Sequence, residues 1–304
     1  MNTRCQDVLD RVLAAVEPVV GRGRIPDEIP ALASVDLRSF GLALATVDGA
    51  VRGVGDWEAP FSIQSLSKVF ALALVLGRDG DRTWTRVGRE PSSHPFNSLR
   101  ELESCGGIPR NPFVNAGALV VVDRLLDLTG DARHALRDFL RAESGADVDF
   151  DKDVALSEAA HAHRNAAVAN LLAGYGNLRH PGDVVLQHYI WQCSIAMSCR
   201  ELAVAGAFLA RAGVRGDGTR LLSASDARSV NATMMTCGTY ESVGEFAHRV
   251  GLPGKSGVGG GILAVVPGRC AIAVWSPGLD LHGTSIAGVA ALEALTAFTG
   301  WSVF

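Results

Sequence analysis

The sequence lacks the features that mark exported, membrane-spanning and nucleic-acid-binding proteins. No run approaches the roughly 18 apolar residues that a membrane-spanning helix needs. Arg4, Asp7 and Asp10 interrupt the N-terminal apolar residues, whereas a secretory signal requires an unbroken apolar centre. The net charge is -4 and the basic residues form no cluster that would attract a nucleic acid. We therefore expect a cytoplasmic protein that acts on a small molecule, with no nucleic-acid partner and no membrane partner.

Cysteine and aromatic residues are also scarce. The six cysteines form no Cys-x-x-Cys pair, so we expect them to be small buried apolar side chains in a reducing compartment.

His161 and His163 stand two residues apart, which turns them away from each other on a helix, and no further ligand motif accompanies them. We expect no metal site. The 304 residues and 34 glycines fit a helix-rich protein with many tight turns and a large core.

Two hairpin patterns lie near the ends of the chain. Runs 40–47 and 51–54 flank Asp48-Gly49, a pair that accepts the positive φ angles of a tight turn. Runs 262–266 and 270–275 flank Pro267-Gly268 in the same way. Apolar residues at helical spacing predict helices elsewhere: 8–16, 66–76, 116–128, 132–141, 159–172, 182–190, 200–212, 227–235, 241–250 and 285–298.

This order of elements predicts an α+β fold. If both hairpins join one antiparallel sheet, residues 1–62 and 223–304 form a sheet-containing lobe flanked by helices. Residues 63–222 then form a helical lobe inserted into it. A ligand site is expected in the cleft between the two lobes.

The first candidate site motif is Ser65-x-x-Lys68 at the start of an apolar helix. Residues three apart lie on one helix face, so the lysine amine can reach the serine hydroxyl. Serine needs an adjacent base to become a nucleophile, and lysine serves as one only when its pKa falls. The structural alternative is a capping serine beside an exposed lysine, but the apolar neighbours of Lys68 are an unusual setting for a solvated side chain.

The second candidate motif is Gly254-Lys255-Ser256-Gly257. It resembles the end of a phosphate-binding loop, but Arg249 stands where that pattern needs glycine, and a β run follows where it needs a helix. The better match is the Lys-Ser/Thr-Gly triplet that accompanies Ser-x-x-Lys in penicillin-recognising serine enzymes. There, Lys255 would add a positive charge on a strand edge that faces the nucleophile.

Longer blocks make the resemblance specific. In chain order they are FSIQSLSKVF (61–70), VGREPSSHPFNS (87–98), PRNPFVNAGA (109–118), SEAAHAHRNAA (157–167), YIWQCS (189–194), MMTCGTY (234–240), LPGKSGVGGGI (252–262) and SPGLD (276–280). This series resembles the serine-dependent glutaminases over the chain from about residue 21 to the C-terminal helix. The resemblance implies a β-lactamase/transpeptidase-like fold, an amidohydrolase activity on L-glutamine without a cofactor, and a homo-oligomer, either dimer or tetramer.

The resemblance also implies roles for individual residues. Ser65 matches the nucleophile, Lys68 its base, and Tyr189 a tyrosine beside the nucleophile that relays protons. Lys255 completes the catalytic set. Ser65 and Tyr189 also belong to the substrate-binding set, together with the other positions that match glutamine-binding residues: Asn115, Glu158, Asn165, Tyr240 and Val258. An acid for the substrate ammonium and amides for its carboxylate are what a free amino acid requires.

Structural alternatives and rival functions remain open at this point. Glu158 fits a first-turn glutamate, Asn115 a helix cap before Ala116, and Tyr189 a core tyrosine. The sequence departs from the family at Glu28, where a tyrosine is common, at 92–94 and at 283–285. The rival functions are a β-lactamase or peptidase on the same scaffold and a glutamine-binding sensor without catalysis.

Overall fold

The protein is built around a five-stranded antiparallel sheet, seen in a computed structural model that describes residues 2–26 and 29–304. The strand order is β2-β1-β8-β7-β6. The strands are β1 (Gly41–Thr46), β2 (Val51–Gly55), β6 (Gly254–Ser256), β7 (Gly261–Val266) and β8 (Cys270–Trp275). The two predicted hairpins are confirmed, and β1 pairs with β8, so both belong to one sheet.

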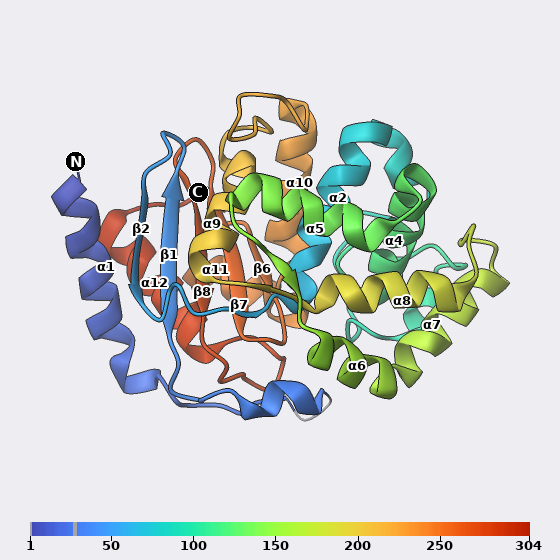
Figure 1. Cartoon of the computed structure of the whole chain (residues 1–304), viewed down its shortest axis with the longest axis horizontal. Coiled ribbons are helices and arrows are strands. Elements are labelled where there is room, and N and C mark those ends of the chain that lie inside the picture. The colour runs from blue at the N-terminus through green and yellow to red at the C-terminus, as the bar shows by residue number, and fades with distance from the viewer. Residues whose placement is uncertain (1, 27–28) are drawn as a thin grey trace.

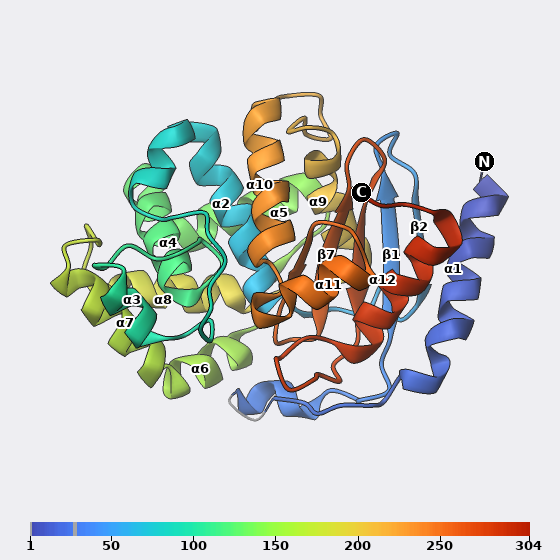
Figure 2. The ribbon, with the colours of Figure 1, turned by 180° about the vertical axis from the view of Figure 1, so that it is seen from behind.

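Helices cover both faces of this sheet (Figures 1 and 2). On one face α1 (Asn2–Val16) packs beside α12 (Ile286–Thr299), over Leu42, Ile262 and Ile272. On the other face α9 (Cys199–Ala210) packs over alternate strand residues such as Ala43 and Ala271. Because side chains alternate across a strand, burial on both faces explains why β7 and β8 are apolar throughout.

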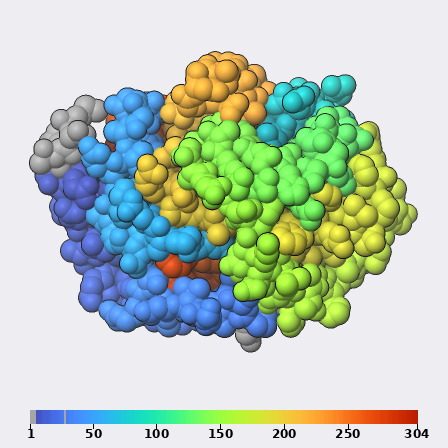
Figure 3. Space-filling model, viewed as in Figure 1, coloured from blue at the N-terminus to red at the C-terminus, as the bar shows by residue number. Residues whose placement is uncertain are grey.

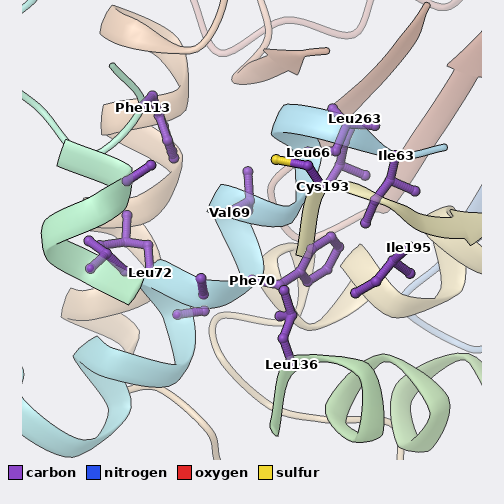
Figure 4. Close-up of a cluster of buried hydrophobic side chains, with 14 of the residues drawn as sticks. Ile63, Leu66, Val69, Phe70, Leu72, Phe113, Leu136, Cys193, Ile195 and Leu263 are labelled. Atoms are coloured by element: carbon purple, nitrogen blue, oxygen red, sulfur yellow. The ribbon is translucent and has the colours of Figure 1, made fainter. Parts of the chain in front are cut away.

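The remaining helices gather beside the sheet (Figure 1), except α11 (Val243–Arg249), whose Phe246 packs on the same sheet face as α12 (Figure 2). Those beside the sheet are α2 (Ser67–Asp79), α3 (Leu99–Ser104), α4 (Asn115–Thr129), α5 (Ala132–Ser144), α6 (Lys152–His161), α7 (His163–Gly174), α8 (Gly182–Cys193) and α10 (Ala224–Cys237). Helix α2 is central among them. Figure 4 shows its Phe70 among Leu136 of α5 and Ile195, and these side chains belong to one buried cluster. This packing anchors the helix that carries the Ser-x-x-Lys motif.

Two features differ from the sequence-based expectation. The predicted helix 159–172 is wrong as one element, because α6 ends at His161 and α7 begins at His163. The His161 ring Nδ1 lies 2.8 Å from the Ser157 carbonyl oxygen, so this side chain caps the end of α6. A second sheet was not predicted. Its strands, β3 (Phe61–Ser62), β4 (Asp149–Phe150) and β5 (Ile195–Met197), are ordered β3-β5-β4.

All six cysteines are free thiols; four are buried, while Cys5 and Cys105 are partly exposed, which departs from the prediction for those two. In the part of the chain that the structure describes, no helix is long and apolar enough to cross a membrane. No group of three or more His, Cys, Asp or Glu within residues 2–26 and 29–304 is arranged to hold a metal ion.

Candidate active site

Ser65 lies in a short 3-10 turn, Gln64–Leu66, that leads directly into α2. The α-helix begins at Ser67, so Ser65 precedes it and Lys68 stands in its first turn. The Ser65 side chain is nearly buried, and its backbone N–H donates no hydrogen bond to any described residue. A nucleophilic hydroxyl and a free N–H are thus presented together at the positive end of a helix.

Lys68 is buried and hydrogen-bonded, which excludes the exposed alternative. Its Nζ donates to the Phe113 carbonyl oxygen at 3.0 Å and to Asn115 Oδ1 at 2.7 Å. Burial lowers the pKa of Lys68 to about 8, against the opposing influence of Cys193 and Glu158. Removal from water disfavours the charged amine, so a neutral lysine is accessible near neutral pH.

Asn115 connects three parts of the site. Its Oδ1 accepts from Lys68 and, at 3.3 Å, from the Tyr189 hydroxyl, while its Nδ2 donates to Asn165 Oδ1 at 2.8 Å. The N-cap of α4 is Val114, so the helix-cap alternative for Asn115 is wrong. Tyr189 is buried on α8, and burial raises its pKa well above 10.0. Its hydroxyl is satisfied within the site rather than elsewhere in the core.

Lys255 and Tyr240 form the opposite wall. Lys255 lies on β6, the edge strand of the main sheet, as predicted. Its Nζ is 4.1 Å from the centre of the Tyr240 ring and donates to the Ser256 carbonyl oxygen. Burial, together with the charge of Lys68, lowers the pKa of Lys255 well below 10.5. The positive charge expected at this position is therefore disfavoured.

Tyr240 is the tyrosine that contacts Ser65. Burial raises its pKa, and a hydrogen bond with the Ser65 side chain acts in the opposite direction. Its φ of 54° lies in the left-handed region, a sterically costly conformation for an aromatic residue. Tyr189 reaches Asn115 instead, so the two tyrosines occupy different places around Ser65 and Lys68.

Glu158 and Asn165 come from different helices, α6 and α7. Glu158 is buried near the end of α6, which excludes a solvated first-turn glutamate. Burial raises the pKa of Glu158 to about 7, while Gln64 and Lys68 favour its anion. Gln64 Nε2 lies 3.5 Å from Glu158 Oε2.

Val258 follows β6 in a turn that passes the nucleophile. A Cβ atom at Gly257 would lie 3.4 Å from Ser65 N and 3.0 Å from the Ile63 carbonyl oxygen. Only glycine permits this approach without crowding. The backbone N–H of Val258, like that of Ser65, donates to no described residue. Glu28, the departure noted in the sequence, lies outside the described residues.

Val258 also lines a cavity of about 140 Å³, together with Ser62, Gly259 and Trp275 among others. Figure 3 shows a hollow on this side, where C-terminal atoms lie between N-terminal and central segments. Sequence reasoning gave no role to Ser62, Gln64 or the Phe113 carbonyl group. The one sequence feature that could have indicated a role for Gln64 was its position directly before Ser65.

Known proteins resemble this chain in both sequence and fold. The glutaminase family model matches residues 23–304. A glutaminase of Streptomyces coelicolor is 61% identical over 303 residues, covering 99% of both chains. A glutaminase of Paraburkholderia phytofirmans is 50% identical over 299 residues, covering 98% of both. A solved structure described as the probable glutaminase YbaS superposes with a TM-score of 0.92 at 36% identity, covering 98% of both. The α+β, β-lactamase-like fold is confirmed, and the chain belongs to the glutaminase family.

Proposed function

We propose that the protein hydrolyses the side-chain amide of L-glutamine to L-glutamate and ammonia through an acyl-enzyme on Ser65. The observation that carries this proposal is the buried Lys68, whose pKa of about 8 makes a neutral amine available. A neutral amine has two hydrogens and one lone pair. Phe113 O and Asn115 Oδ1 accept the two hydrogens, so the lone pair remains for the Ser65 proton.

The acylation step follows from that arrangement. Ser65 Oγ attacks the amide carbon while Lys68 takes the hydroxyl proton. Two backbone N–H groups, of Ser65 and Val258, donate to the oxyanion, and each such donor contributes about 3 kcal/mol to transition-state stabilisation in comparable hydrolases. The carbon–nitrogen bond then breaks as the protonated Lys68 gives its proton to the leaving nitrogen, and ammonia departs.

Deacylation repeats the same proton transfers with water. Lys68 removes a proton from the water that attacks the γ-glutamyl ester. The carbon–oxygen bond to Ser65 breaks, and Ser65 recovers its proton from Lys68, releasing glutamate. Tyr240, which lies beside Ser65, and Tyr189, bonded to Asn115, hold the two groups in place and complete the proton relay. Lys255 supports the face of Tyr240.

Recognition of a free amino acid is assigned to the buried polar residues. Glu158 as an anion pairs with the α-ammonium group. Asn165 accepts from Asn115 through its oxygen, so its amide nitrogen is left to donate to the α-carboxylate. The remaining amide hydrogen of Asn115, the hydroxyl of Tyr240 and the backbone of Val258 complete the set.

We further propose where the substrate binds, where the protein acts and how it assembles. The substrate is bound in the cleft between the sheet-containing lobe, 1–62 and 223–304, and the helical lobe, 63–222. The protein acts in the cytoplasm as a homo-oligomer, dimer or tetramer. Light scattering of the purified protein tests the assembly, and a monomeric mass would contradict it.

A side-by-side assay of glutamine and a chromogenic β-lactam tests the reaction. The expected result is ammonia from glutamine and no lactam opening. Lactam turnover without ammonia would favour the β-lactamase or peptidase alternative. Tight glutamine binding without turnover would favour the sensor.

A further inference from the structure

A buried chain of hydrogen bonds connects the end of α8 to Glu158. The Ser62 hydroxyl donates to the Cys193 carbonyl oxygen at 2.9 Å. Gln64 Nε2 donates to Ser62 Oγ at 3.1 Å and lies 3.5 Å from Glu158 Oε2. Ser62 and Gln64 are 7% and 2% exposed, so both side chains are largely removed from water.

Counting hydrogens fixes the orientation of the Gln64 amide. Ser62 has a single hydroxyl hydrogen, and the Cys193 carbonyl oxygen takes it. Ser62 can therefore only accept from Gln64, which must present its nitrogen and not its oxygen. Since Glu158 also needs a donor when it is an anion, the same amide nitrogen serves both neighbours.

The backbone holds Ser62 firmly in this position. Cys193 is the last residue of α8, so its carbonyl oxygen lacks a partner within the helix and needs an outside donor. Ser62 pairs with Ala196 in the β3–β5 ladder, which brings it to that helix end. On the other side a Cβ atom at Gly259 would lie 2.3 Å from the Ser62 carbonyl oxygen and 3.4 Å from Gln64 Cγ. Gln64 itself has a φ of 48°.

We propose that Ser62 is a positioning residue: it orients the Gln64 amide and thereby keeps Glu158 anionic for the ammonium group of glutamine. The inference rests on the proposed role of Glu158 in substrate binding. Ser62 acts only through Gln64 and contacts neither the substrate nor the reacting atoms.

The charged and polar groups around Glu158 explain why the orientation of the Gln64 amide affects the protonation of this carboxyl group. Among residues 2–26 and 29–304, the titratable groups that interact with it are Lys68 on α2 and Tyr189 and Cys193 on α8, and η2 (Pro30–Ser34), packed against α6, carries none. Burial raises the pKa of Glu158 to about 7, opposed by the Gln64 hydrogen bond and by Lys68. A Gln64 amide that turns its oxygen toward Glu158 removes a donor and adds repulsion, so the carboxylate gains a proton at higher pH.

The test is steady-state kinetics of Ser62→Ala across pH. KM for glutamine should rise about tenfold, the factor that corresponds to about 1.4 kcal/mol, while kcat changes less than about twofold. On the acid limb of kcat/KM, the lower step, which belongs to Glu158, should move to higher pH by about half a unit or more, while the step of Lys68 stays in place. Ser62→Thr keeps the hydroxyl and should restore both quantities. An unchanged KM, or a raised KM without movement of the acid limb, would overturn the proposal.

Ser194→Ala is the matched control. Ser194 is also buried and its hydroxyl also donates to an α8 carbonyl, that of Trp191 at 2.9 Å, but it has no bond to Gln64. It should leave KM and the acid limb unchanged, and an equal effect would assign the result to loss of helix-end stability.

A double-mutant cycle isolates the path through Gln64. In a Gln64→Met background, Ser62→Ala should have no further effect on KM, whereas additive effects would contradict the proposal. Glu158→Gln, measured in parallel, distinguishes a failure of the proposed role of Ser62 from a failure of the proposed role of Glu158. If it leaves KM unchanged, the role of Glu158 fails; if it raises KM while Ser62→Ala does not, only the role of Ser62 fails.

Discussion

The two buried lysines of the site stand in different environments: Lys68 in the first turn of α2, and Lys255 on the edge strand β6. Two of the three lysines in the chain are thus removed from water, and only Lys152 is exposed. Lys68 has two oxygen acceptors from other segments, whereas Lys255 donates to the carbonyl group of its own neighbour and packs on Tyr240.

We propose that this difference separates a lysine that carries protons, Lys68, from one that supports its neighbours, Lys255. Burial lowers the pKa of Lys68 to about 8, close enough to neutral pH for the amine to lose and regain a proton during turnover. Burial and the charge of Lys68 lower the pKa of Lys255 well below 10.5, and its amine donates to the carbonyl group of Ser256. We infer that burial alone does not make a lysine a base. The hydrogen-bond partners differ between the two lysines, and we infer that they decide which one can act as the base.

The largest expected effect is that of Lys68→Met, which keeps most of the side-chain volume and removes the base. kcat should fall about 10³-fold, the usual cost of losing a general base. Ammonia release from glutamine measures it. Lys152→Met, at the exposed lysine, is the matched control and should retain wild-type turnover. A Lys68→Met enzyme within tenfold of wild type would end the assignment of Lys68 as base.

The pH profile should show two groups that must lose protons. Below the pKa of Lys68, about 8, the amine is protonated and cannot act as a base. Below the pKa of Glu158, about 7, the carboxyl is neutral and cannot pair with the ammonium group. kcat/KM should therefore fall as pH drops through 8 and fall more steeply below 7. Glu158→Gln should lose the lower step alone, and a flat profile over this range would contradict both assignments.

A smaller effect is expected for Lys255→Met. The methionine side chain fills the same space beside Tyr240 but removes one hydrogen bond, so kcat/KM should fall about tenfold. The Lys68 step in the pH profile should stay in place. If Lys255→Met lowers kcat/KM as much as Lys68→Met does, or removes the Lys68 step from the pH profile, then Lys255 is not merely a supporting residue and the proposed distinction is wrong.

Sequence reasoning located the long elements and the main residues of the site, for identifiable reasons. Asp48-Gly49 and the apolar runs of β7 and β8 carry strong local signals, and the hairpins they predict were found. Strands β3, β4 and β5 span two or three residues, too few for an alternating pattern to be detected. The break at Ala162 has no proline or glycine to announce it.

The finer geometry of the site depends on tertiary contacts that no local pattern encodes. The order of the motifs indicated Ser65 and Lys68, but which tyrosine reaches Ser65 is set by how α8 and the Tyr240 turn pack around α2. The orientation of Gln64 likewise depends on Ser62 and Cys193, which meet only because β3 pairs with β5 beside the end of α8.

Turnover of glutamine by Ser65→Ala, compared with the wild-type protein, tests the central claim most directly. Circular dichroism should show the same fold for both proteins, since Ser65 Oγ contributes little to the core. The account predicts ammonia and glutamate from the wild-type protein and none above the uncatalysed background from Ser65→Ala. Comparable turnover by the two proteins would contradict a covalent mechanism at Ser65.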